Sequence, residues 1–169
     1  MREEITRLTK RMNRLHLLLR VTVHRLMMER GLYFGQLPIL EFAMEHEGCT
    51  QNDLAEFMQV TPPSVARSVM RMQRTGLLNV TQDEKNRRKN RIIVTEKGRE
   101  MALLCGNDIK QIEQQMFAGF AKEEVQRLCG YIERLTANLE TDAFKDRSFF
   151  SLVAEMKEMQ TKEKVKDKP

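Results

Sequence analysis

The sequence has no apolar run approaching the roughly 18 residues that a membrane-spanning helix requires. Residues 1–10 are charged, whereas a signal peptide would be apolar. The three cysteines are odd in number and lie far apart, which argues against a disulfide framework and indicates a reducing compartment. We therefore expect a soluble, cytoplasmic protein with no membrane partner.

The motifs of catalysis are also missing. The sequence has no glycine-rich phosphate loop, no nucleophile with a matching base and no paired-carboxylate motif. His46 and Cys49 are close in sequence, but zinc prefers four ligands and no histidine follows residue 46. These absences argue against an enzyme and predict neither a cofactor nor a metal site.

The composition fits a folded, basic protein. The length of 169 residues corresponds to about one domain, and 41% of the residues are hydrophobic, which is enough for a packed core. The net charge of +5 is uneven: residues 31–60 carry five acidic and no basic groups, whereas residues 61–99 carry ten basic and three acidic groups. The basic segment suits a phosphate-binding surface, but a solvated basic face would have the same charge.

Apolar periodicity predicts long amphipathic helices at both ends of the chain. Apolar residues recur at steps of three and four from Ile5 to Leu26, and again from Val125 to Leu139. A shorter segment places Phe149, Leu152, Val153 and Met156 on one face. An isolated subunit would expose these long stripes to water, so they require a partner. We expect the charged tail, residues 161–169, to be disordered.

Two short helices and a hairpin are predicted between these ends. Thr50 can cap a helix with Asp53 at its third position, and Thr61, followed by two prolines, can open another that ends before Gly76. Val65, Val69 and Met72 lie on one side of the second helix, and its polar side carries Ser64, Arg67, Ser68 and Arg71. Two β-prone runs, residues 78–81 and 92–94, then enclose a basic loop.

This order predicts a mainly α protein with a small β-hairpin wing, that is, a winged helix-turn-helix joined to a helical dimerisation region. A helix about 10–12 Å across fits the major groove of double-stranded DNA. Backbone amides at residues 61–64 can bind a phosphate, and arginines at the hairpin tip can enter a minor groove. The predicted helix contacts are Thr61, Pro63, Ser64, Arg67, Ser68 and Arg71; the predicted wing contacts are Lys85, Arg87, Arg88 and Lys89.

The segment from Gly31 to Gly98 closely resembles the MarR family of bacterial transcriptional regulators. The motifs that carry the resemblance are TQNDLAEFMQVTPPSVAR, RTGLL and DEKNRRKNRIIVTEKG. With the flanking helices, it extends over roughly residues 1–145. Where the family usually has a second acid before its paired arginines, this chain has Asn86, so Asp83 is the expected brace for Arg87 or Arg88.

The resemblance implies a homodimeric repressor that binds a pseudopalindromic operator through two half-sites about 34–36 Å apart. It also implies a division of the chain. Residues 1–30 would form an N-terminal dimerisation helix, residues 31–98 the DNA-binding module, residues 99–160 the C-terminal dimerisation helices and residues 161–169 the tail.

Members of the family commonly respond to small aromatic ligands, and some respond to oxidants or zinc. The sequence has twelve methionines, whose side chains repack easily around a ligand. Arg20, His24, Tyr33 and Met44 are the candidate contacts for an anionic aromatic effector. Cys49, beside Gly48 in a predicted loop, is the best candidate for a reactive thiol, whereas Cys105 and Cys129 occupy apolar helical positions that favour burial.

Two alternatives remain open at this point. One is a helical protein-interaction module that does not bind DNA and whose basic hairpin contacts an acidic protein. The other is a thiol or metal sensor variant of the same regulator.

Overall fold

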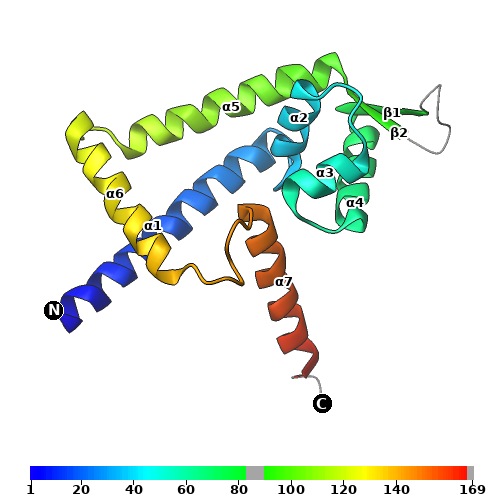
Figure 1. Ribbon diagram of the computed structural model, residues 1–169. Helices are drawn as coiled ribbons and strands as arrows, with labels where there is room; N and C mark the ends of the chain where they lie inside the picture. The colour runs from blue at the N-terminus through cyan, green and yellow to red at the C-terminus, as the bar shows by residue number, and fades with distance from the viewer. Residues whose placement is uncertain (83–89, 167–169) are drawn as a thin grey trace.

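The computed structural model describes residues 1–82 and 90–166, and within them it is mainly helical with one antiparallel hairpin (Figure 1). This confirms the predicted fold class. In chain order the elements are α1 (Arg2–Glu29), α2 (Gln36–Glu45), α3 (Gln51–Met58), α4 (Pro62–Arg74), β1 (Leu78–Gln82), β2 (Asn90–Val94), α5 (Glu96–Met116), α6 (Lys122–Leu139) and α7 (Phe149–Lys166). No helix in these described ranges is long and apolar enough to span a membrane.

The short helices begin and end at residues suited to those positions. The Asp53 amide donates to the Thr50 hydroxyl at 3.2 Å, and the Thr50 amide donates to the Asp53 carboxylate at 2.8 Å, which forms a capping box. Gln59 ends α3 in the left-handed region, with φ of 52°. Gly76, with φ of 72°, follows Thr75, the C-cap residue of α4. These residues hold α3 and α4 in a helix-turn-helix arrangement.

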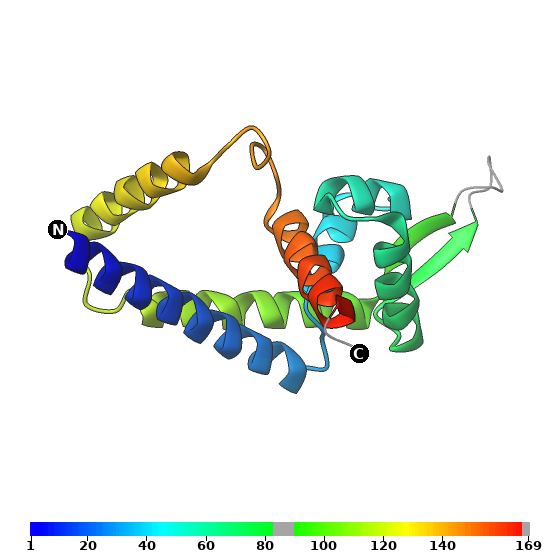
Figure 2. The same ribbon diagram turned by 90° about the horizontal axis from the view of Figure 1, so that it is seen from below.

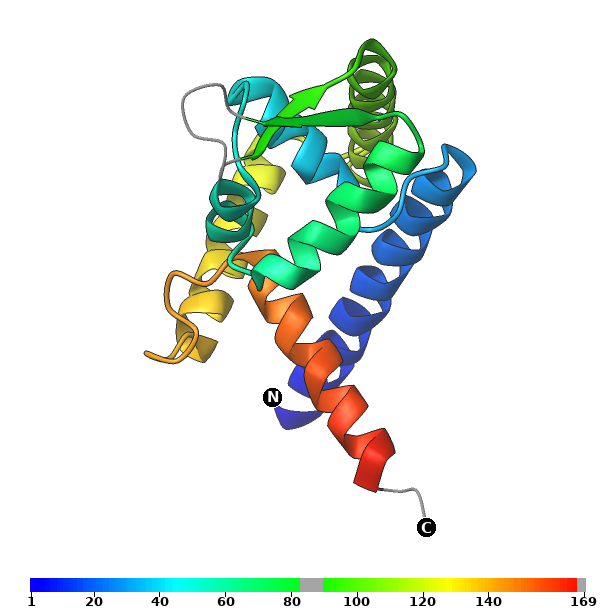
Figure 3. The ribbon, with the colours of Figure 1, turned by 90° about the vertical axis from the view of Figure 1, so that its right-hand side faces the viewer.

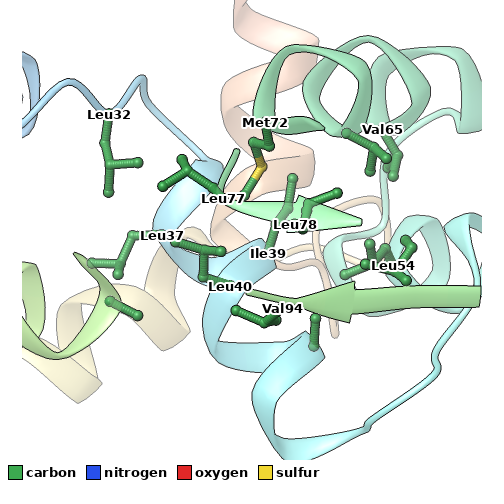
Figure 4. Packing of buried hydrophobic residues seen from close by; sticks show 14 of the residues in the cluster. Leu32, Leu37, Ile39, Leu40, Leu54, Val65, Met72, Leu77, Leu78 and Val94 are labelled. Carbon is green, nitrogen blue, oxygen red and sulfur yellow. The ribbon is translucent and has the colours of Figure 1, made fainter. Parts of the chain in front are cut away.

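The core lies among α2, α3, α4 and the hairpin (Figure 4). Its fully buried side chains come from every one of these elements and include Leu40, Leu54, Val69, Met72, Leu78 and Ile92. Each such side chain contributes about 1.5–3 kcal/mol relative to exposure. A backbone hydrogen bond also joins the hairpin to the loop before α3: the Ile92 amide donates to the Cys49 carbonyl at 2.9 Å. The core therefore fixes the position of α4 and the base of the hairpin.

Helices α1 and α5 pack together and extend away from this module, and α6 follows beyond the far end of α5 (Figures 1 and 2). At the module end, the Arg30 guanidinium forms a 2.9 Å ion pair with the Asp108 carboxylate. The predicted apolar stripes are uncovered in the single subunit: Ile5 is 58% exposed and Leu139 is 78% exposed, and no α6 residue is buried.

Helix α7 returns to the module and lies across a cleft from α4 (Figure 3). Of the four residues that the sequence places on one face, Val153 is buried, and Phe149, Leu152 and Met156 are exposed. The helix also continues to Lys166, beyond the point where the sequence predicted disorder. Residues 161–166 include lysines and a glutamate, which favour helix, and they prolong a helix that is already formed. Residues 167–169 lie outside the described part of the chain.

Candidate nucleic-acid interface

Helix α4 buries one side and exposes the opposite one. Val65, Val69 and Met72 are buried against the core, while Arg67 and Arg71 are exposed. Ser64 and Ser68 are half-buried at the edge of the polar side. The structure therefore places the predicted major-groove residues together on one accessible flank of a rigidly seated helix.

The N-terminal end of α4 differs from the prediction. The Ser64 and Val65 amides both donate to the Thr61 carbonyl, at 2.9 Å and 3.3 Å, and Pro62 and Pro63 have no amide proton. The phosphate site predicted at residues 61–64 therefore depends on fewer free amides than the sequence suggested, and it stays a prediction. The Thr61 and Ser64 hydroxyls lie 3.0 Å apart, and these side chains are the polar groups available there.

Arg71 makes a contact that the sequence did not predict. The central carbon of its guanidinium lies 4.3 Å from the centre of the Tyr33 ring, which is a cation–π contact. Tyr33 was assigned to an effector pocket, whereas the structure places it against a candidate DNA contact. Both side chains remain exposed.

The hairpin leads directly to the predicted wing tip. β1 pairs with β2 from Leu78 opposite Val94 to Gln82 opposite Asn90. The predicted contacts at the tip and their brace lie outside the described residues; they are Asp83, Lys85, Arg87, Arg88 and Lys89. Arg91 is half-buried and donates to the Gly48 carbonyl at 3.0 Å, so it helps to anchor the base of the hairpin.

The four candidate effector contacts are dispersed. Arg20 lies 5.8 Å from the centre of the Phe34 ring, and Tyr33 stacks with Arg71. His24 is exposed on α1, and Met44 is half-buried against the core. The cleft of about 540 Å³ beside α4 is lined by other residues, chiefly from α4 and α7.

The cysteines also depart from expectation. Burial raises the pKa of the Cys49 thiol, and the Asp53 carboxylate raises it further. A thiol with a raised pKa is a poor nucleophile, so the structure argues against Cys49 as the reactive residue. Cys105 is buried as predicted, and Cys129 is exposed in the single subunit because its helix, α6, is uncovered. Among the described residues, no group of three His, Cys, Asp or Glu is placed to hold a metal ion.

Comparison with known proteins finds similarity to one family. The model of the MarR family matches residues 32–89, which include the helix-turn-helix and its hairpin. This segment of the chain is therefore similar to the MarR family.

Individual relatives agree with this assignment. An uncharacterized HTH-type transcriptional regulator of Bacillus subtilis, YybA, is 27% identical over 108 residues, which are 64% of this chain and 72% of YybA. The crystal structure of YusO from Bacillus subtilis aligns with a TM-score of 0.70 at 19% identity, covering 80% of this chain and 96% of YusO. A putative MarR family regulator from Listeria monocytogenes, solved with a 26mer DNA, aligns with a TM-score of 0.60 at 19% identity, covering 78% of this chain and 87% of that one. This chain therefore shares the fold of both solved structures.

Two features of this protein escaped sequence reasoning. The stacking of Tyr33 on Arg71 joins residues far apart in the chain, and no periodicity predicts it. The placement of α7 beside α4 brings Lys157 and Lys162 close to the recognition flank. The only hint in the sequence was the apolar spacing of residues 149, 152, 153 and 156, which does not say what the helix packs against.

Proposed function

We propose that this protein is a transcriptional regulator of the MarR family and not an enzyme, and that it is a ligand-responsive repressor that binds a pseudopalindromic operator as a homodimer in the cytoplasm. The observation that carries the proposal is α4 itself. Its apolar side is locked into the core and its arginines project into solvent, which is the arrangement that major-groove recognition requires.

In this proposal, the flank of α4 reads the bases. Arg67 and Arg71 can each donate two hydrogen bonds to a guanine, and a good bidentate contact of this kind contributes about 1–3 kcal/mol of discrimination. Ser64 and Ser68 reach phosphates or base edges, and Thr61 and Pro63 meet the backbone at the entry to the groove. At the wing, Lys85, Arg87, Arg88 and Lys89 contact the adjacent minor groove, with Asp83 bracing the paired arginines.

The apolar stripes support the homodimer. Ile5 and Leu8 on α1, and Leu135 and Leu139 on α6, are all exposed in one subunit. Burying them against a second copy stabilises the dimer by about 25 cal/mol for each Å² of apolar surface removed from water. Two-fold symmetry then presents two α4 helices to successive major grooves, about 34–36 Å apart.

The contact between Tyr33, in the loop after α1, and Arg71 on α4 offers a route for a ligand response. An anionic aromatic compound that binds near Arg20, His24, Tyr33 or Met44 and draws Tyr33 away from Arg71 would alter the recognition flank. The effector then favours a state that binds DNA less tightly, and the operator is released by a shift of population.

The decisive experiment is selection of genomic DNA fragments by the purified full-length protein, followed by binding titrations on the enriched sequence. We expect an enriched pseudopalindrome, a steep loss of affinity with salt, and weaker binding by Arg67→Ala. Arg127→Ala on α6, far from α4, is the matched control. A library that yields no enriched palindrome would overturn the proposal in favour of a protein-interaction module.

A further inference from the structure

The beginning of α7 is hydrogen-bonded to the turn between α3 and α4. The Gln59 side-chain amide donates to the Asp146 carbonyl at 2.9 Å, and the Ser148 amide donates to the Gln59 side-chain oxygen at 2.6 Å. The Ser148 hydroxyl donates to the Met58 carbonyl at 2.8 Å. Three hydrogen bonds therefore tie the start of α7 to the turn that precedes the recognition helix.

Apolar contacts hold the first half of α7 against the module, and ionic contacts lie within the segment itself. The Phe34 ring lies 6.3 Å from that of Phe149 and 6.2 Å from that of Phe150, measured between ring centres. Val153 is 6% exposed. Within this segment, Arg147 pairs with Glu155 and donates to the Ser151 hydroxyl. The position of α7 thus depends on packing as well as on polar contacts.

Docked in this way, α7 forms one wall of the 540 Å³ cleft, and α4 forms the opposite wall. The polar residues that line it are Ser64, Arg67 and Ser68 from α4 and Lys157, Glu158 and Lys162 from α7. Lys162 also lines a second cleft, together with Thr61. Half of the predicted α4 contacts therefore share one cleft with lysines of α7.

The charges in this cleft favour an anion. Arg67 and Lys162 form no ion pair in the part of the chain that the structure describes, and Lys157 lies 5.1 Å from the centre of the Phe34 ring. Arg67 and Lys162 thus line the cleft with one carboxylate, that of Glu158, and with the hydroxyls of Ser64 and Ser68. A group with several negatively charged oxygens would relieve the repulsion among the cations and accept hydrogen bonds from the hydroxyls.

We propose that α7 is part of the DNA-binding surface, with Lys157 and Lys162 contacting a backbone phosphate beside Arg67. This rests on the proposed function. The major groove is about 12 Å wide and a helix with its side chains is about 10–12 Å across, so a helix seated in the groove has a phosphate strand along its flank. Ser64, Arg67 and Ser68 of that flank line the cleft, which favours the duplex backbone as the source of the phosphate.

The test is the salt dependence of DNA binding by the full-length protein, measured on a mixed-sequence duplex of about 30 base pairs that accommodates two half-sites. Each lost phosphate contact lowers the slope of log affinity against log salt by about 0.9. We therefore expect the double variant Lys157→Gln/Lys162→Gln to lower the slope by the amount that corresponds to one or two lost contacts. For each lost contact, the drop in affinity between 50 and 200 mM salt becomes about three- to fourfold smaller.

Lys122→Gln, at the first residue of α6, is the matched control and should leave the slope unchanged. Helix α6 follows the end of α5 that lies far from the module (Figure 1). Val153→Asp should detach α7 and reproduce the effect of the lysine variants, whereas Gln160→Asp, which adds the same charge at an exposed position of α7, should not. Circular dichroism of each variant verifies that the helices are retained.

Several results would overturn the proposal. If Arg67→Ala weakens binding and the lysine variants behave like Lys122→Gln, α7 does not contact DNA, although the proposed function stands. If Val153→Asp tightens binding, α7 obstructs the recognition helix. Inorganic phosphate and benzoate, tested at constant ionic strength, distinguish a further case. If either anion binds saturably and the lysine variants abolish that binding without changing the salt slope of DNA binding, the cleft holds a small anion. If the wild-type protein binds no duplex, both proposals fail.

Discussion

The Arg71 guanidinium stacks 4.3 Å above the ring of Tyr33, so a candidate base contact is oriented by a residue of the loop between α1 and α2. An exposed cation–π contact contributes about 0.5–1 kcal/mol. Because the contact restricts the arginine before DNA arrives, it reduces the entropy that binding must remove. The loop and the recognition helix are coupled through this pair.

Tyr33→Ala should therefore weaken operator binding by about two- to fivefold, which corresponds to the free energy of the cation–π contact. Tyr33→Phe keeps the ring and should bind like the wild-type protein. Titrations with both variants, with Arg71→Ala and with the double variant Tyr33→Ala/Arg71→Ala complete a mutant cycle. Additive losses in that cycle would show that the pair does not cooperate in binding.

Gly98 in the first turn of α5 is required by a close backbone approach. A Cβ atom there would lie 2.0 Å from the Leu77 carbonyl oxygen and 2.8 Å from Val94. Gly98→Ala should lower the free energy of unfolding by at least about 2–3 kcal/mol, since backbone must shift to admit the methyl group. Gly106 on the same helix has no atom within 4 Å of such a Cβ, so Gly106→Ala should stabilise the protein by about 0.5–1 kcal/mol. Urea denaturation at one protein concentration tests both, and equal destabilisation would contradict the assignment.

Leu135 tests the homodimer. It is 40% exposed on a helix with no buried residue, so a glutamate there changes nothing inside the subunit. If α6 packs against a second copy, Leu135→Glu should bury an unpaired charge in the interface and shift the protein to monomers. Sedimentation velocity reports the change, with Glu133→Gln as an exposed control. A wild-type protein that sediments as a monomer at micromolar concentration would refute the predicted dimer.

The thiols should differ in reactivity. Burial raises the pKa of Cys49 and Cys105, so at neutral pH both hold less thiolate than in the unfolded chain and should alkylate far more slowly than after denaturation. The raised pKa also means that these thiols favour the folded state below the unfolded-state pKa. That contribution is lost as the pH rises through the folded-state pKa. Iodoacetamide labelling followed by mass spectrometry measures each site. Rapid native labelling of Cys49 would restore the thiol-sensor hypothesis.

Local patterns predicted most of the elements because local chemistry controls them. The Thr50 and Asp53 cap, the prolines after Thr61 and the glycine at residue 76 act within a few residues, so their spacing is sufficient to locate α3 and α4. The structure adds one detail at the start of α4: the Thr61 carbonyl accepts from both the Ser64 and the Val65 amide. Residue types predict a helix cap, but they do not specify which backbone hydrogen bonds form within it.

The sequence alone determined the helix-turn-helix, the charged flank of α4 and the apolar stripes of α1 and α6, since each depends on a short repeat that every copy of the chain carries. Only the tertiary structure decided that Tyr33 lies under Arg71, that Cys49 is buried, and that α7 docks on the turn at Gln59. These relationships join residues that are distant in the chain. Such contacts depend on the shape and polarity of both surfaces that meet. The periodicity of a sequence describes one surface and does not identify the other.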